Sequence, residues 1–269
     1  MRFFALLVLL LTAVPALADI YDNLGRTAEK NGAEKSLAAK LTERTRAAGY
    51  AQETTAAIEN ALNAQIGMSA TRVSEKVLEG IAKKVQQQAV ANAALKVKAR
   101  YETAYAVAKQ MGLKGKQAEN TADIAADALA AGANEASMTK TAKRLASMQQ
   151  DKEKYAVAVM AFYRDMLRYG VKETSAAGIA DESLDNLSAD EISEYRHHFM
   201  KNAGTNAQNM AETMHSHIEH GNSASSMGSS GGHSGSEGHG SGGSSGGSGG
   251  HGGGGHGGGG GGGHGGKSK

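Results

Sequence analysis

The chain has 269 residues, and its 29 Lys and Arg nearly balance its 27 Asp and Glu. This near balance gives no reason to expect nucleic acid or an anionic membrane as a partner. Cysteine is absent, which excludes disulfides, catalytic thiols and Cys-ligated zinc sites. The single proline is Pro15, and the abundant Ala, Glu, Lys, Gln and Leu favour long helices, so we expect an all-α fold.

The first 18 residues have the pattern of an export signal. Arg2 precedes an apolar run over residues 3–11, and Ala16 and Ala18 form an A-x-A cleavage site. The run is too short for the helix of about 20 residues that crosses a membrane. We therefore expect cleavage after Ala18 and a periplasmic or secreted mature protein without an integral membrane segment.

An all-helical domain is expected over residues 32–221, after a flexible lead-in over residues 19–31. The first helix of this domain should cover residues 33–48. Gly49 then lies where a glycine commonly ends a helix, because glycine adopts positive φ without steric cost.

A weak internal repeat organises the expected domain. The pairs Gly49-Tyr50, Gly112-Leu113 and Gly170-Val171 each precede a short helical segment, a turn and a longer helix. Such self-similarity is typical of stacked helix-turn-helix units, although an Ala-rich helical chain also produces it by coincidence. An elongated helical bundle is the alternative architecture. The predicted units lie near residues 49–111, 112–169 and 170–220.

Long Ala-rich helices are predicted within these units, over residues 69–111 and 135–169. A further helix begins at Ser188, where Ser188 and Glu191 match the S-x-x-E capping box. Alanine buries little area, and burial contributes only about 25 cal/mol per Å². We therefore expect the domain to gain stability from a homo-oligomer or a protein partner.

The chain changes character after Gly221. Apolar side chains become scarce there, and from Gly228 the sequence is almost entirely Gly, Ser and His. Because few apolar groups offset the entropy of fixing the chain, residues 222–269 are predicted to form a disordered Gly/Ser/His-rich tail.

All ten histidines lie between His197 and His264. Neutral imidazole is a common ligand of transition metals, so this region is a candidate site for Ni²⁺, Cu²⁺ or Zn²⁺, with no organic cofactor. The irregular spacing encodes no fixed geometry, which favours binding or buffering over a catalytic metal site; a tail that binds metal only incidentally is the alternative. The predicted ligands are His215, His217, His220, His233, His239, His251, His256 and His264.

Two methionines suggest a copper variant of this site. Met210 and Met214 precede His217 at helical spacing, and thioether with imidazole suits Cu(I). Methionines four residues apart are, however, ordinary core residues, and Ile218 extends the same stripe. We therefore expect Met210 and Met214 to fill the core.

Two E-x-x-H matches resemble the ligand motif of di-iron carboxylate bundles. They end at His197 and His215, and their glutamates, Glu194 and Glu212, are 18 residues apart. On one continuous helix that separation is about 27 Å, too far for a shared metal pair. Only a hairpin at Gly204 could bring the two motifs together.

Enzymatic motifs are absent from the sequence. The chain has no P-loop and no G-x-S-x-G elbow, and no His or Cys precedes His197. We therefore expect an exported, non-enzymatic protein whose histidines bind or buffer divalent metal. The alternative is a structural or protein-interaction module with the tail as a spacer. A third hypothesis is acid response, because histidines gain charge below about pH 6.5.

Overall fold

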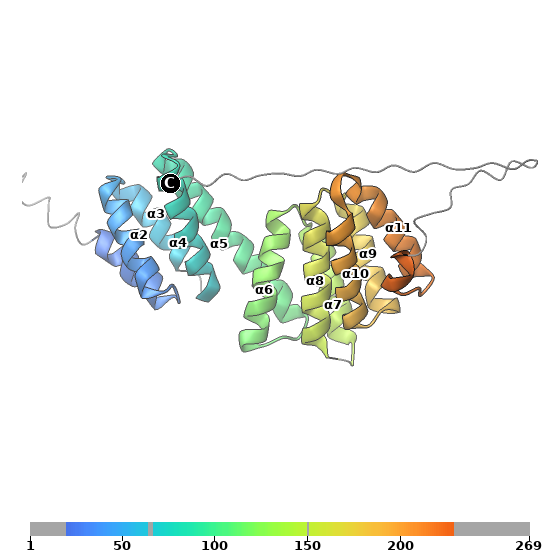
Figure 1. The fold of residues 1–269 in the computed structure, drawn as a ribbon. Helices are drawn as coiled ribbons and strands as arrows, with labels where there is room; N and C mark the ends of the chain where they lie inside the picture. Colours follow the sequence, from blue (N-terminus) through green and yellow to red (C-terminus); the bar gives the residue numbers. More distant parts are fainter. Residues whose placement is uncertain (1–19, 64–66, 150, 229–269) are drawn as a thin grey trace, which may run out of the picture. The chain divides into compact units, whose positions relative to one another are not determined.

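A computed structural model describes residues 20–63, 67–149 and 151–228 (Figure 1). The described residues form helices joined by short turns and contain no strand, as the composition predicts. None of the helices in the described ranges has the length and apolarity of a membrane span. A helix over residues 20–30 is followed by α2 (Lys35–Ala47), α3 (Gln52–Leu62), α4 (Gly67–Ala82), α5 (Gln87–Gln110), α6 (Gly115–Ala130), α7 (Glu135–Ser147), α8 (Lys152–Arg168), α9 (Glu173–Asn186), α10 (Ala189–Asn202), η1 (Gly204–Asn206), α11 (Ala207–Glu219) and η2 (Ala224–Gly228).

The helices pack in a recurring order. From α2 to α9, each helix contacts the next helix but one, so that α2 meets α4, α3 meets α5 and so on to α9 and α11. The same hydrogen bond recurs in this packing. The main-chain N–H of Ala51 donates to Gln87 Oε1, and that of Lys172 donates to Gln208 Oε1, each across 36 residues. The contact between a helix and the next but one therefore recurs from α2 to α11.

The glycine–apolar pairs of the sequence are helix C-terminal motifs. Gly49, Gly112 and Gly170 have φ of 64°, 86° and 85°. In each pair the apolar residue is buried, and its N–H bonds to the carbonyl five residues earlier. These glycines end α2, α5 and α8, so each predicted unit holds three helices. The expected pattern of one short and one long helix per unit is wrong, because α4 and α5 are separate helices, and so are α7 and α8.

The predicted helix over residues 69–111 is interrupted. α4 ends at Ala82 and α5 begins at Gln87. Between them Lys84 takes a φ of 53°, the conformation that glycine takes in the equivalent turns. Val85 follows it and is 43% exposed, although it continues the four-residue spacing of the apolar residues Val77 and Ile81. The prediction missed this break because neither Gly nor Pro marks it.

The predicted helix over residues 135–169 is also interrupted. α7 ends at Ser147, and α8 begins at Lys152. The Asp151 side chain accepts a hydrogen bond from the Lys154 N–H at 3.3 Å and so caps α8. This break did have a signal in the sequence, since aspartate is a preferred N-cap residue.

Both boundaries of the helical region differ from those predicted. Residues 20–30 form a helix and not a flexible lead-in, because Leu24 and Ala28 are fully buried and the Tyr21 hydroxyl donates to the Tyr50 carbonyl at 2.7 Å. Residues 222–228, predicted to belong to the tail, contact α10 and α11 through η2. Their apolar residues Ala224 and Met227 are buried there. The predicted signal and residues 229–269 lie outside the described residues.

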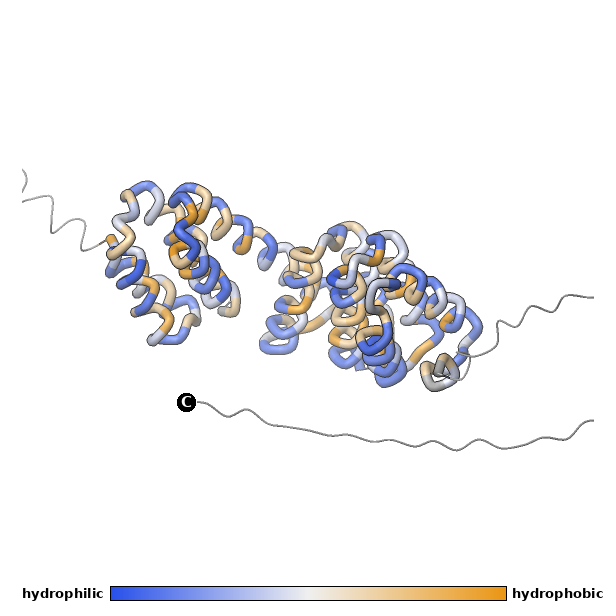
Figure 2. The backbone as a smooth tube through the Cα atoms, turned by 45° about the horizontal axis from the view of Figure 1, so that its top comes forward, coloured by the Kyte–Doolittle hydropathy of each residue, from blue (hydrophilic) through white to orange (hydrophobic). Residues whose placement is uncertain are grey.

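The core combines many alanines with a few large side chains. Hydrophobic and hydrophilic residues alternate along the helices in the manner of amphipathic segments (Figure 2). The largest fully buried side chains include Tyr163, Tyr195, Phe162 and Phe199. In the described part of the chain, only Val85 and Tyr169 are large hydrophobic residues with exposed side chains.

Candidate metal-binding groove

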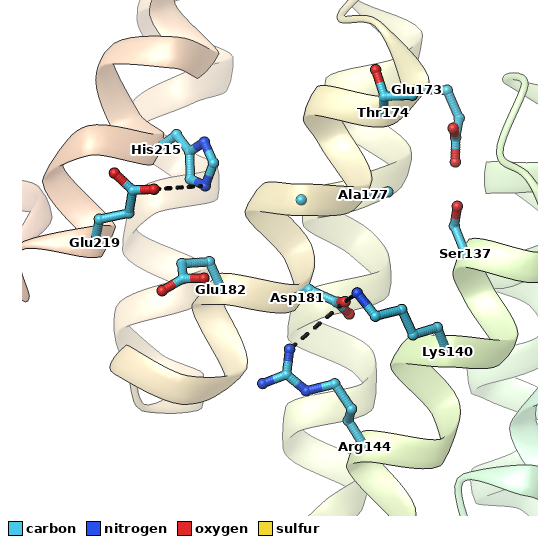
Figure 3. Close-up of a pocket in the computed structure, with 11 residues that line it drawn as sticks. Ser137, Lys140, Arg144, Glu173, Thr174, Ala177, Asp181, Glu182, His215 and Glu219 are labelled. Carbon is cyan, nitrogen blue, oxygen red and sulfur yellow. Dashed lines mark ion pairs between the residues drawn. The ribbon is translucent and has the colours of Figure 1, made fainter.

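A polar groove of about 480 Å³ crosses α7, α9 and α11. α9 contacts both of the other helices, so the groove is built by the recurring packing order. Figure 3 shows Lys140 and Arg144 on α7, Asp181 and Glu182 on α9, and His215 with Glu219 on α11. Four carboxylates and two cationic side chains line it, together with His215.

His215 and Glu219 face the groove because of the helical period of α11. Met214 and Ile218, their neighbours in sequence, are fully buried in the core. Residues four apart lie on one face, and His215 Nε2 is 3.7 Å from Glu219 Oε1 (Figure 3). Their side chains are 36% and 52% exposed. Opposite them lies Gly178, where an added Cβ would be 3.9 Å from His215 Cε1.

The cationic side chains of the groove are already neutralised. The Asp181 carboxylate forms an ion pair with Lys140 Nζ at 2.6 Å and accepts a hydrogen bond from the Thr141 hydroxyl at 2.8 Å. Arg144 bonds to Asp185, and this bond raises the pKa of the guanidinium. Glu182 is half-buried and lies near the His215–Glu219 pair (Figure 3). The charge left uncompensated in the groove is therefore negative, which favours a bound cation.

The other predicted ligands of α11 do not join His215. His220 is exposed, and its Nδ1 lies 2.6 Å from the Ser216 carbonyl oxygen. His217 is half-buried, and its Nδ1 has no hydrogen-bond partner. Within the ranges that the structure describes, no three His, Asp or Glu side chains form a metal cage. His233, His239, His251, His256 and His264 lie outside the described residues.

The two methionines behave as core residues. Met214 is fully buried, and Met210 packs against the core cluster. Their burial confirms the core interpretation and gives no support to a thioether site for Cu(I). The described geometry brings neither sulfur to the groove that His215 lines.

The two E-x-x-H motifs lie on different helices. The helix ends before Gly204, so that Glu194 and His197 are on α10 while Glu212 and His215 are on α11. α10 and α11 contact each other. Among the described residues, however, the two motifs do not assemble a cage of three ligands. The sequence prediction overlooked a different feature, the neighbouring His197 and His198 beside Glu194 on the exposed side of α10.

The chain matches no protein-family model, no curated protein and no solved structure. Function therefore has to be inferred from the groove and the histidines themselves.

Proposed function

We propose that this protein binds divalent transition-metal ions, Ni²⁺, Cu²⁺ or Zn²⁺, through its C-terminal histidines, with His215 and Glu219 as a fixed two-ligand seat. The observation that carries this proposal is the 3.7 Å separation between His215 Nε2 and Glu219 Oε1. Metal–nitrogen and metal–oxygen bonds of about 2.0–2.2 Å place two donors of one ion roughly 3–4 Å apart. The pair can therefore hold an ion without moving α11.

Two electrostatic features support the same proposal. Glu219 is the last residue of α11, and the C-terminal end of a helix favours positive charge. Glu182 adds a carboxylate from α9 on the same groove. The tail histidines are proposed as further metal-binding groups of the chain: His233, His239, His251, His256 and His264. A chain with several imidazoles suits capture and buffering, and we assign the protein no enzymatic activity and an exported location.

The test is calorimetric titration of the metal-free mature chain with Ni²⁺, Cu²⁺ and Zn²⁺. His215→Gln and Glu219→Gln should each weaken one site, because each removes one donor of the seat. His220→Gln is the matched control, since it removes one imidazole at the C-cap of α11, outside the groove. Replacing the five tail histidines by glutamine should lower the number of ions bound. If the wild-type chain binds these ions no more tightly than at millimolar concentrations, the proposal is refuted.

A protein-interaction module is the second candidate, favoured by the recurring contacts of each helix with the next but one. Stacked helical units present extended binding surfaces, and the groove crosses three of these helices. In this case the Lys140→Glu variant, changed in the groove, should no longer capture a partner protein. The Lys143→Glu variant, changed outside the groove, should still capture it. Equal capture by both variants would contradict an interaction through this groove.

A further inference from the structure

We propose a second binding site, for a small aliphatic carboxylate, in a hollow between the C-terminal ends of α2 and α4. The site is independent of the proposed metal binding, because it shares no residue with the metal-binding groove. The hollow has a volume of about 360 Å³ and is lined by Ala48, Gly49, Tyr50, Ile81, Lys84, Val85 and Gln87. Its walls come from helices in direct contact, since α2 packs on α4 and α4 packs on α5.

The end of α4 departs in two respects from the turns that follow α2, α5 and α8. In all four turns an apolar residue donates its N–H to the carbonyl five residues earlier, and the donors are Val85, Tyr50, Leu113 and Val171. The last three are buried and follow a glycine, whereas Val85 is 43% exposed and follows Lys84. Lys84 holds a φ of 53°, a conformation that costs a lysine more than a glycine. Backbone strain of this kind clusters at ligand sites, and here it lies in the wall of a hollow.

The charge of the hollow is positive. Lys84 is the only charged side chain among the described residues that line it. Within the described part of the chain Lys84 forms no ion pair, whereas the adjacent Lys83 pairs with Glu79. An amino group without a neighbouring carboxylate favours an anionic ligand, and it bonds well to carboxylate oxygens.

Two uncharged hydrogen-bond donors belong to residues of the same hollow. Tyr50 is 6% exposed, and its hydroxyl is buried without a hydrogen-bond partner among the described residues. Burial raises the pKa of Tyr50, so this hydroxyl keeps its proton at neutral pH and remains a donor. Gln87 Oε1 accepts from the Ala51 N–H at 2.8 Å, which orients the side chain and leaves its NH₂ group as a second donor. A carboxylate, which only accepts hydrogen bonds, complements these groups and Lys84.

The remaining lining is apolar and limits the size of the ligand. Ile81 packs against the hydrophobic core, while Ala48 and Val85 are exposed. The volume of about 360 Å³ lies at the lower end of the range for small-molecule sites, about 300–1,000 Å³. This size favours a small molecule over an extended peptide. A carboxylic acid with a short unbranched chain places its charged head on the donors and covers Val85 with its chain.

The experiment is a titration of the mature chain with hexanoate, followed by nuclear magnetic resonance of the amide signals of Lys84, Val85 and Gln87. Acetate lacks the aliphatic chain and hexanamide lacks the charge, so each should bind at least about tenfold more weakly than hexanoate. Lys84→Gln should weaken hexanoate binding about tenfold by removing the cation, and Tyr50→Phe should weaken it about threefold or more by removing a donor. Lys83→Gln is the matched control and should keep the wild-type affinity, because Lys83 does not line the hollow.

Lys84→Gly separates a binding role of this lysine from a structural one. Relief of the positive φ should raise the melting temperature of the free chain, while loss of the amino group should weaken hexanoate binding. A purely structural role predicts the same rise in melting temperature with unchanged affinity for hexanoate.

Three results would overturn the carboxylate site. The first is that hexanoate binds no more tightly than acetate or hexanamide. The second is that Lys84→Gln or Tyr50→Phe keeps the wild-type affinity for hexanoate. The third comes from a hexapeptide with a free C-terminal carboxyl group, which carries the same chemistry on a longer chain. If this peptide binds more tightly than hexanoate, the ligand is the end of a protein chain and not a small acid.

Discussion

Asp165 should be among the most costly charged residues to replace. It lies on α8 with 4% of its surface exposed. Its carboxylate accepts hydrogen bonds from Arg164 Nε at 2.8 Å and from Arg196 Nε, on α10, at 2.5 Å. Removing one partner of a fully buried pair costs about 3–5 kcal/mol. Because the Arg196 side chain is 31% exposed and asparagine keeps the shape, we expect Asp165→Asn to cost about 2–3 kcal/mol.

Asp190→Asn is the matched control for this prediction. Asp190 also joins α8 to α10, through Lys154 at 2.7 Å, but these side chains are 73% and 54% exposed. Exposed pairs contribute about 0.2–1 kcal/mol. The free energy of unfolding is measured by urea titration followed by circular dichroism. If Asp165→Asn lowers the free energy of unfolding by an amount within about 1 kcal/mol of the control's, Asp165 does not form a stabilising buried ion pair between α8 and α10.

The pH dependence provides a second test of Asp165. Burial raises the pKa of the Asp165 carboxyl, but the hydrogen bonds from Arg164 and Arg196 lower this pKa by a larger amount. The pKa of Asp165 is therefore below its ordinary value. The stabilisation is therefore fully present above the unfolded pKa of about 3.9 and is lost as pH falls through the folded pKa. The difference between wild type and Asp165→Asn should shrink below about pH 4. A difference that stays constant down to about pH 2 would contradict the ion-pair account.

Three further predictions concern turns, core and caps. Lys84→Gly should raise the free energy of unfolding by about 0.5–1 kcal/mol, because Lys84 has a φ of 53°, which glycine adopts without steric cost. Gly49→Ala should lower it by about 1–2 kcal/mol, because Gly49 has a φ of 64°, although there is space for a Cβ. Changes in melting temperature of the same sign for both variants would refute this reasoning. Phe199→Ala removes a fully buried ring in edge contact with Phe162 and should cost about 3–5 kcal/mol in urea unfolding; a cost below about 1 kcal/mol would contradict its core role. Ser188→Ala breaks the capping box of α10 and should cost about 1 kcal/mol, and an unchanged urea midpoint would show that the cap is dispensable.

The helical fold and several helix ends could be predicted because they depend on local chemistry. The capping box at Ser188 and Glu191 is present as predicted. The positive φ of Gly49 is confirmed as well. The buried stripe of α8, with Val159 and Phe162 fully buried, follows the helical period. Each of these features depends on residues within a few positions of one another, where sequence patterns carry most of the information.

The helix breaks and the packing order required information that the local sequence lacks. Lys84 adopts a glycine-like conformation that no residue preference predicts, so the break between α4 and α5 was missed. Contacts between each helix and the next but one depend on the buried faces of both, and glycine positions do not encode them.

The candidate site was predictable in part. The spacing of His215 and Glu219 places them on one face of a helix, and the structure confirms that they lie together. Their groove was not predictable, because Lys140, Asp181 and Gly178 reach it from α7 and α9 through tertiary packing. The separation of His217 and His220 from His215 depends likewise on which face of α11 enters the core.

Metal binding at His215 is tested most directly by nuclear magnetic resonance of the histidine side chains in the mature chain with substoichiometric Cu²⁺. A paramagnetic ion broadens the signals of the residues that hold it. If His215 and Glu219 form the fixed seat, the His215 imidazole signals should broaden before those of His220, and Glu219→Gln should remove this preference. If the His215 signals stay sharp while those of other histidines broaden, the central claim is contradicted.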